Sequence, residues 1–196
     1  MQKNNSRIIL ASSSVYRKEL LSRLQINFET AIPDINESQF ESESPSQLVQ
    51  RLSKEKAQAI SSLYPDAIII GSDQVAAFDN KILGKPGNFE NAVTQLKMIS
   101  GKSIIFHTGL TVIDGSSNKT QTDEVKIKVE FKSLSDETIH NYLKKEPAFN
   151  CAGSFKSEGL GIALTNKISE DDPTALIGLP LIRLTQMLEN INFNIV

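Results

Sequence analysis

The sequence is poor in the residues on which several enzyme classes depend. It contains one cysteine, two histidines and no tryptophan among its 196 residues. A single thiol cannot form an internal disulfide, which favours a reducing compartment. His107 and His140 lie in strand-like and helix-like surroundings that match neither a zinc-ligand pattern nor a catalytic triad. Zinc chemistry and Ser-His or Cys-His hydrolysis are therefore disfavoured.

Two further features are missing, namely a long apolar run and an excess of charge. No apolar stretch approaches the roughly 18 residues that a membrane span needs, and the opening Met-Gln-Lys-Asn-Asn does not resemble a secretory signal. The formal net charge is −2 at pH 7, which gives no support to a general surface for nucleic acid or acidic membranes. We expect a cytoplasmic protein that binds neither nucleic acid nor membrane, in which any phosphate site is local.

The residues that are plentiful are carboxylates, lysines and hydroxyls. These are the groups used in magnesium–phosphate chemistry. The length predicts one domain over residues 1–196, or a domain with a deep cleft between two lobes. There is no internal repeat, low-complexity tract or evident linker.

A short β-branched run is the centre of the predicted fold. Ala67-Ile68-Ile69-Ile70 is typical of a strand buried on both faces in an α/β sheet. Gly71 and Ser72 break this run, so we expect Asp73 and Gln74 to stand where the strand emerges into a crevice. Ligands of open α/β sheets bind just outside strand carboxyl ends, which makes Asp73 a candidate for chemistry. A local turn held by the Asp73 side chain is an equally good interpretation of this segment alone.

A strand, a serine loop and a helix follow one another near the start of the chain. Arg7–Ala11 predicts a buried strand, Ser12 to Ser14 offer an N-cap, and an amphipathic helix follows. The first turns of that helix carry Arg17 and Lys18, which oppose the helix dipole unless an anion is bound nearby. The sequence therefore allows a phosphate site here, although a plain capped helix with solvated basic residues explains the same pattern.

Further elements are predicted along the chain. Lys54 and Lys56 both lie on the helix that starts at Ser44-Pro45, and either could be a surface charge. Lys85 lies on a rigid, exposed Gly-Lys-Pro-Gly turn. The remaining expected elements are a strand at Ile26–Ile32, a polar loop at 33–44, a buried stripe of Leu48, Leu52, Ala59 and Leu63, a hairpin of Val75–Phe78 with Ile82-Leu83, helices at Phe89–Ile99, from Ser135 and at Leu181–Leu188, strands at Ile104–Ile113 and Val125–Phe131, and a glycine-rich loop at Asn150–Ile162.

Four separated motifs together resemble the Maf family of nucleoside triphosphate pyrophosphatases, along nearly the whole chain. They are Leu10-Ala11-Ser12-Ser13-Ser14 with Arg17 and Glu19-Leu20-Leu21, Gly71-Ser72-Asp73-Gln74-Val75, Gly84-Lys85-Pro86, and Cys151-Ala152-Gly153-Ser154-Phe155-Lys156-Ser157-Glu158-Gly159. The resemblance implies an α/β fold with a mixed twisted sheet, flanking helices and two lobes around a deep cleft. It also implies cleavage between the α- and β-phosphates, to give a nucleoside monophosphate and pyrophosphate. Within the family, the motifs resemble the branch that hydrolyses 7-methyl-GTP.

The resemblance also implies roles for individual residues. Asp73 would be the proton acceptor that activates water, and Glu37 with Asp73 would hold a divalent cation, Mg²⁺ or Mn²⁺. The positions implied for substrate binding are Ser12, Tyr16, Arg17, Lys56, Gln74, Lys85 and Glu158, of which Tyr16, Gln74 and Glu158 match the positions that select the base. Val15-Tyr16 and Asn36 differ from the residues that the family often has there.

Simple chemistry agrees with the implied base preference. A guanine presents N1–H and an amine on one edge, which the Glu158 carboxylate could accept together, and a methylated purine is a cation that could stack on Tyr16. The alternatives are a pyrophosphatase for dTTP and UTP, which Gln74 and Glu158 disfavour, and a non-catalytic nucleotide-binding regulator of cell division, which an intact Asp73 disfavours. The substrate would be a nucleoside triphosphate, and a homodimer is one assembly that the sequence leaves open.

Overall fold

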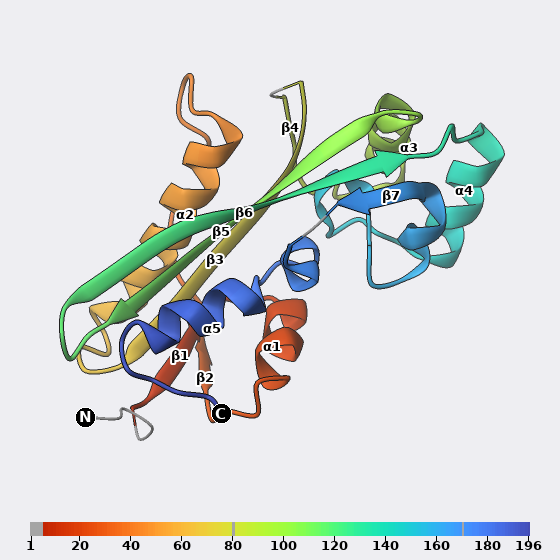
Figure 1. The fold of residues 1–196 in the computed structure, drawn as a ribbon. Helices are drawn as coiled ribbons and strands as arrows, with labels where there is room; N and C mark the ends of the chain where they lie inside the picture. Colours follow the sequence, from red (N-terminus) through yellow and green to blue (C-terminus); the bar gives the residue numbers. More distant parts are fainter. Residues whose placement is uncertain (1–5, 80, 170) are drawn as a thin grey trace. The chain divides into compact units, whose positions relative to one another are not determined.

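The computed structural model describes residues 6–79, 81–169 and 171–196. Its strands form one sheet in the order β2-β1-β3-β5-β6-β7, with β4 paired to β3 (Figure 1). β1 pairs in parallel with β2 and β3, whereas β3–β4 and β6–β7 are antiparallel. The predicted α/β class with a mixed sheet and flanking helices is therefore confirmed.

The bounds of the elements follow the chain. The strands are β1 (Ile8–Ala11), β2 (Glu29–Ala31), β3 (Ile68–Phe78), β4 (Lys81–Leu83), β5 (Ser103–Asp114), β6 (Lys119–Phe131) and β7 (Thr165–Ser169). The helices are α1 (Val15–Ser22), α2 (Pro45–Ser61), α3 (Phe89–Ile99), α4 (Asp136–Lys145) and α5 (Leu181–Glu189), with short 3₁₀ turns η1 (Ala152–Ser154), η2 (Leu160–Leu164) and η3 (Pro173–Ile177). Among the described residues, no helix is both long enough and apolar enough to cross a membrane.

The chain divides into two compact units. The first unit contains the residues up to Asp73, Thr108–Val125 and the residues from Asp172 on, and the second contains Gln74–His107 and Lys126–Asp171. The expected cleft stays a prediction.

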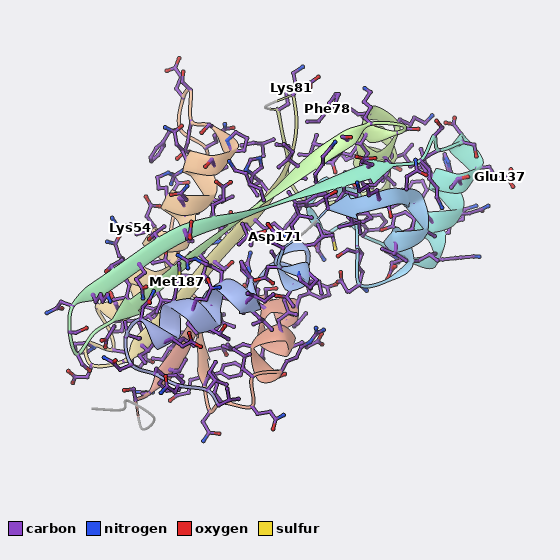
Figure 2. The ribbon with its side chains drawn as sticks, in the orientation of Figure 1. Lys54, Phe78, Lys81, Glu137, Asp171 and Met187 are labelled. Carbon is purple, nitrogen blue, oxygen red and sulfur yellow. The ribbon has the colours of Figure 1, made fainter. Side chains whose placement is uncertain are left out.

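In the first unit, the central strands are buried on both faces because helices cover each face. On one face, Ile8, Leu10, Ile68 and Ile70 pack with apolar residues of α1 and α5, such as Met187 (Figure 2). On the other, Ile9, Ala11, Ala67 and Ile69 pack with Ala57 and Ile60 of α2. Along β1 and β3, successive residues belong alternately to the two clusters, because side chains of a strand point alternately to opposite faces of the sheet. The continuous apolar runs of these strands are thereby explained.

In the second unit, aromatic packing supports the loop that follows α4. The Phe155 ring lies 5.7 Å from the Phe106 ring of β5 and 5.1 Å from the Phe131 ring of β6, measured between centroids. All three side chains are buried. On β6, Ile127 and Val129 are buried while Lys126 and Lys128 are exposed, so one face of this strand is solvated. The glycine-rich loop is thus anchored to the sheet at Phe155.

Most predicted helices have the expected starts because their caps are in the sequence. Ser14, Ser44, Asn88 and Ser135 each accept a hydrogen bond from a backbone N–H of the first turn of α1, α2, α3 and α4. Ser44 and Gln47 also form a reciprocal capping box. The hairpin of β3 with β4 is confirmed as well, with Ala77 opposite Ile82.

Three predictions need correction. The strand does not end at Gly71, because β3 runs without interruption to Phe78 and Asp73 lies inside it. Leu63 does not belong to the buried stripe of α2 and is 68% exposed, since it follows the helix end at Ser61. The strand β7 was not anticipated because Thr165–Ser169 is mostly exposed and carries no apolar alternation.

Gly71 marks a close approach rather than a strand end. A Cβ atom at Gly71 would overlap the backbone carbonyl of Ser53 and crowd Ala57, both on α2. Glycine therefore lets the helix pack directly on β3. This contact brings α2 to the strand two residues before Asp73.

Candidate active site

A buried lysine and aspartate form the centre of the candidate site. Lys56 Nζ of α2 lies 2.6 Å from Asp73 Oδ1 of β3 and 2.8 Å from Glu37 Oε1. Lys56 is 5% exposed and Asp73 is 7% exposed, whereas Glu37 lies on an exposed loop. A buried carboxylate is costly unless it is paired. The ammonium group thus explains how β3 carries an aspartate through its interior.

The structure decides between the two lysines of α2. Lys54 is exposed, whereas Lys56 is buried. The side chain of Lys54 is labelled in Figure 2. Residues two apart on a helix do not share a face, so the close packing of α2 at Gly71 selects Lys56. The resemblance favoured the same residue.

Arg17 is held by neutral acceptors at the start of α1. Its Nε donates to the Gly178 carbonyl oxygen at 2.8 Å, and Nη1 donates to Ser12 Oγ at 3.5 Å. Burial lowers the pKa of the Arg17 guanidinium, and the nearby charges of Asp73 and Glu37 partly oppose this effect. Because these two hydrogen bonds go to uncharged groups, they orient the cation without neutralising it. Arg17 is accordingly suited to receive an anion.

The Gly178 carbonyl connects Arg17 to the strand that carries Asp73. Ser72 Oγ lies 2.9 Å from this oxygen and 2.8 Å from the Gly109 carbonyl oxygen, and Ser72 is fully buried. Gly178 follows the turn η3 with φ +124°, a conformation that favours glycine. The turn is fixed further because Thr108 Oγ1 donates to the Ala175 carbonyl at 2.9 Å.

Ser12 and Tyr16 take different positions around α1. Ser12 is buried, and its Oγ accepts a hydrogen bond from the Ser14 N–H at 3.1 Å. Tyr16 is half-buried in the first turn of the helix, one residue before Arg17. The first unit therefore brings together Ser12, Arg17, Glu37, Lys56 and Asp73. Tyr16 directly precedes Arg17 in the sequence.

The other three predicted residues, Gln74, Lys85 and Glu158, belong to the second unit. Gln74 is half-buried on β3, while Lys85 and Glu158 are exposed. Burial raises the pKa of the Cys151 thiol to about 11, with a further contribution from the negative charge of Glu158 and an opposing one from Lys85. Lys85 and Glu158 thus lie within electrostatic reach of the same thiol.

Backbone hydrogen bonds join the Gly-Lys-Pro turn to the glycine-rich loop. The Gly87 N–H donates to the Phe149 carbonyl at 3.0 Å, and the Gly153 N–H donates to the Gly84 carbonyl at 3.3 Å. The Gln95 side chain of α3 adds a bridge, because its Nε2 donates to the Gly84 carbonyl at 3.1 Å and its Oε1 accepts from Ser154 Oγ at 2.6 Å. The turn bearing Lys85 and the loop bearing Glu158 are therefore one connected structure.

Sequence reasoning did not identify four supporting residues. They are Ser72, Gln95, Glu146 and Gly178, and each acts through a contact between segments distant in the chain. Ser72 had a signal, since a serine inside a buried apolar run must find an acceptor. Gln95, Glu146 and Gly178 had no comparable signal, because their partners become neighbours only in the fold.

The donor set near Asp73 fits a divalent cation that the substrate helps to hold. Glu37 and Asp73 both approach Lys56 Nζ, so two carboxylates converge. No cluster of three or more His, Cys, Asp or Glu side chains able to hold a metal occurs in the part of the chain that the structure describes. Mg²⁺ commonly takes one or two carboxylates and completes its shell with water and substrate phosphates.

Comparisons with known proteins agree with the motifs. The family model described as "Maf-like protein" matches residues 7–191. The chain is 53% identical over 182 residues to a 7-methyl-GTP pyrophosphatase of Colwellia psychrerythraea, covering 93% of this chain and 91% of that protein. It is 50% identical over 183 residues to a 7-methyl-GTP pyrophosphatase of Albidiferax ferrireducens, covering 93% and 92%. A solved structure of the Staphylococcus aureus Ham1 protein is similar with a TM-score of 0.48 at 14% identity, covering 65% of this chain and 73% of that one.

Proposed function

The chain belongs to the Maf family, and on that premise we propose that it hydrolyses 7-methyl-GTP to 7-methyl-GMP and pyrophosphate. Relatives about half identical over nearly the whole chain carry that activity in their names. The structural observation that carries the proposal is the buried contact of Lys56 with Asp73. Such a pair places a carboxylate next to cationic groups, which is what water activation at a phosphate requires.

In the proposed reaction, Asp73 accepts a proton from the attacking water. Lys56 holds and orients this carboxylate, because its ammonium group lies 2.6 Å from Asp73 Oδ1. Arg17 binds phosphate oxygens with the part of its guanidinium that does not contact Gly178. Ser12 lies next to it, directly after the C-terminal end of β1. The leaving pyrophosphate carries additional charge, which Lys85 is suited to neutralise.

We assign the divalent cation to Glu37 and Asp73. When bound, such a cation neutralises phosphate charge and polarises the phosphorus–oxygen bonds. Mg²⁺ is the proposed ion because both donors are carboxylates and two protein ligands suffice for it. Glu37 lies on an exposed loop, and it contacts the same Lys56 ammonium group at 2.8 Å that Asp73 contacts at 2.6 Å.

Base selection is assigned to Tyr16, Gln74 and Glu158. The Glu158 carboxylate can accept two hydrogen bonds from the guanine edge, one from N1–H and one from the amine. The positive charge of a 7-methylated purine adds a cation–π attraction of about 0.5–2 kcal/mol on the Tyr16 ring. A cytoplasmic location is part of the proposal, supported by the single cysteine of the chain. A homodimer stays a prediction.

A nucleotide panel tests the proposal. Pyrophosphate release is measured with 7-methyl-GTP, GTP, dTTP, UTP, CTP and ITP, with Mg²⁺ and with EDTA. We expect Mg²⁺-dependent turnover that is fastest with 7-methyl-GTP. Tyr16→Ala should reduce its advantage over GTP, and Glu158→Ala should reduce its advantage over ITP, which lacks the amine. Preference for dTTP or UTP would refute the base assignment, and turnover of no nucleotide would refute the enzymatic proposal.

A further inference from the structure

Glu146 connects the end of α4 to the segment that contains Glu158. Its carboxylate accepts a hydrogen bond from Lys156 Nζ at 2.9 Å and further hydrogen bonds from the backbone N–H groups of Leu160 and Gly161. The Glu146 side chain is 17% exposed. Burial alone would raise the pKa of this carboxyl, but the three donors outweigh that effect and lower it. Glu146 is therefore ionised at neutral pH and bound on both of its oxygens.

The three donors lie on both sides of Glu158 in the sequence. Lys156 precedes Glu158 by two residues, and Leu160 and Gly161 follow it. A Cβ atom on Gly159 would overlap both carboxylate oxygens of Glu146, so glycine beside Glu158 is what allows the carboxylate to enter. The Glu146 carboxylate thus holds the segment at positions on both sides of Glu158.

Tyr142 supplies a second attachment from the same helix. Its hydroxyl oxygen accepts a hydrogen bond from the Lys156 N–H at 3.1 Å, and its side chain is buried. Residues 142 and 146 are four apart, so they lie on one face of the chain as it leaves α4. Among the described residues, the hydrogen bond of the Glu158 side chain is a long one, which Oε2 accepts from Ser157 Oγ at 3.4 Å. Its direction consequently depends on the backbone that Glu146 and Tyr142 hold.

We propose that Glu146 is a positioning residue for base selection, which acts by fixing the Lys156–Gly161 segment so that the Glu158 carboxylate is oriented before the nucleotide binds. This inference rests on the proposed function. Orientation before binding reduces the entropy that association must overcome. The effect therefore belongs to nucleotide affinity and selectivity, whereas the chemistry at Asp73 is unaffected.

A double-mutant cycle separates positioning from general stabilisation. Glu146→Ala is expected to raise KM for 7-methyl-GTP about tenfold and to change kcat by less than about twofold, because one charge-assisted hydrogen bond is worth roughly that factor. The ratio of 7-methyl-GTP to ITP turnover, which reports recognition of the guanine amine, falls toward that of Glu158→Ala. The double variant is no worse than Glu158→Ala alone, since Glu146 acts through Glu158. Glu146→Gln, which keeps an acceptor but loses the charge, is intermediate.

Glu137→Ala is the matched control, because Glu137 is exposed on α4, the helix that Glu146 directly follows (Figure 2). It should leave both the KM and the nucleotide ratio at the wild-type value. Hydrogen exchange provides a readout independent of catalysis, with faster exchange of the Leu160 and Gly161 amides expected only in the Glu146 variants.

The possible results are distinguishable. Wild-type enzyme with no preference for 7-methyl-GTP overturns the proposed function and this inference with it. A wild-type preference that Glu146→Ala retains, or one that it loses additively with Glu158→Ala, overturns this inference alone. Unchanged hydrogen exchange of the two amides also overturns it, because the Glu146 carboxylate would then not hold the segment.

Discussion

Replacing Lys56 by methionine removes the ammonium group from Asp73 and keeps most of the side-chain volume. Asp73 is 7% exposed, so its carboxylate would remain buried without its cation. The half-exposed Glu37 can be hydrated instead and adds little to the cost. The loss of stability should therefore come mainly from the buried, unpaired carboxylate of Asp73.

Removing one partner of a buried ion pair leaves the other charge buried without compensation and typically costs about 3–5 kcal/mol. Because Asp73 is almost completely buried, we expect Lys56→Met to lower the free energy of unfolding by an amount in this range.

Urea unfolding at pH 7 measures this cost. Lys54→Met on the exposed face of α2 is the matched control, and we expect it to change stability by less than about 0.5 kcal/mol. If Lys56→Met were as stable as Lys54→Met, the pair would not stabilise Asp73. If adding Asp73→Asn to Lys56→Met restored no stability, the loss would come from packing, and the electrostatic reasoning would be refuted.

Three further predictions concern the surroundings of the site. Ser72→Ala removes the single hydroxyl proton that the Gly109 and Gly178 carbonyls share, although Gly178 keeps Arg17 Nε as a donor. It should cost about 1–3 kcal/mol in urea unfolding and raise KM for every nucleotide, whereas the exposed control Ser116→Ala should do neither. Gly71→Ala forces α2 away from β3 and should lower the melting temperature and kcat together; a fully active, equally stable variant would contradict the close approach. At pH 8 the Cys151 thiol, whose pKa is about 11, should react with a disulfide reagent about tenfold more slowly than a thiol of pKa 9, because its smaller thiolate fraction outweighs the higher nucleophilicity of that thiolate. Glu158→Gln should accelerate the reaction; an unchanged rate would mean that this carboxylate is remote.

Local signals predicted the helices and the central strands well. Serine and asparagine caps and the proline of α2 are contained within a few residues of each helix start, and the apolar run of β3 has one plausible environment. The end of β3 was predicted wrongly because Gly71 and Ser72 look like a strand end when their partners are unknown. In the fold, Gly71 meets α2 and Ser72 finds two carbonyls, so the strand continues.

The candidate site likewise contains some residues that the sequence indicates and others that only the fold reveals. The sequence, together with the family resemblance, indicated Asp73 and favoured Lys56, and the structure places the two in contact. The residues that hold the site, such as Gly178 and Glu146, could not be predicted, because their roles arise from contacts across distant segments. A carboxylate at the end of an amphipathic helix looks like any solvated surface charge until its partners are located.

Product analysis with Asp73→Asn tests the central claim most directly. Asparagine keeps the shape of the side chain and an oxygen for Lys56, but it cannot accept a proton from water. We predict that the wild-type protein converts 7-methyl-GTP to 7-methyl-GMP and pyrophosphate in equal amounts, and that Asp73→Asn binds the nucleotide without turning it over. Release of a diphosphate with inorganic phosphate, or turnover by Asp73→Asn at the wild-type rate, would contradict the account.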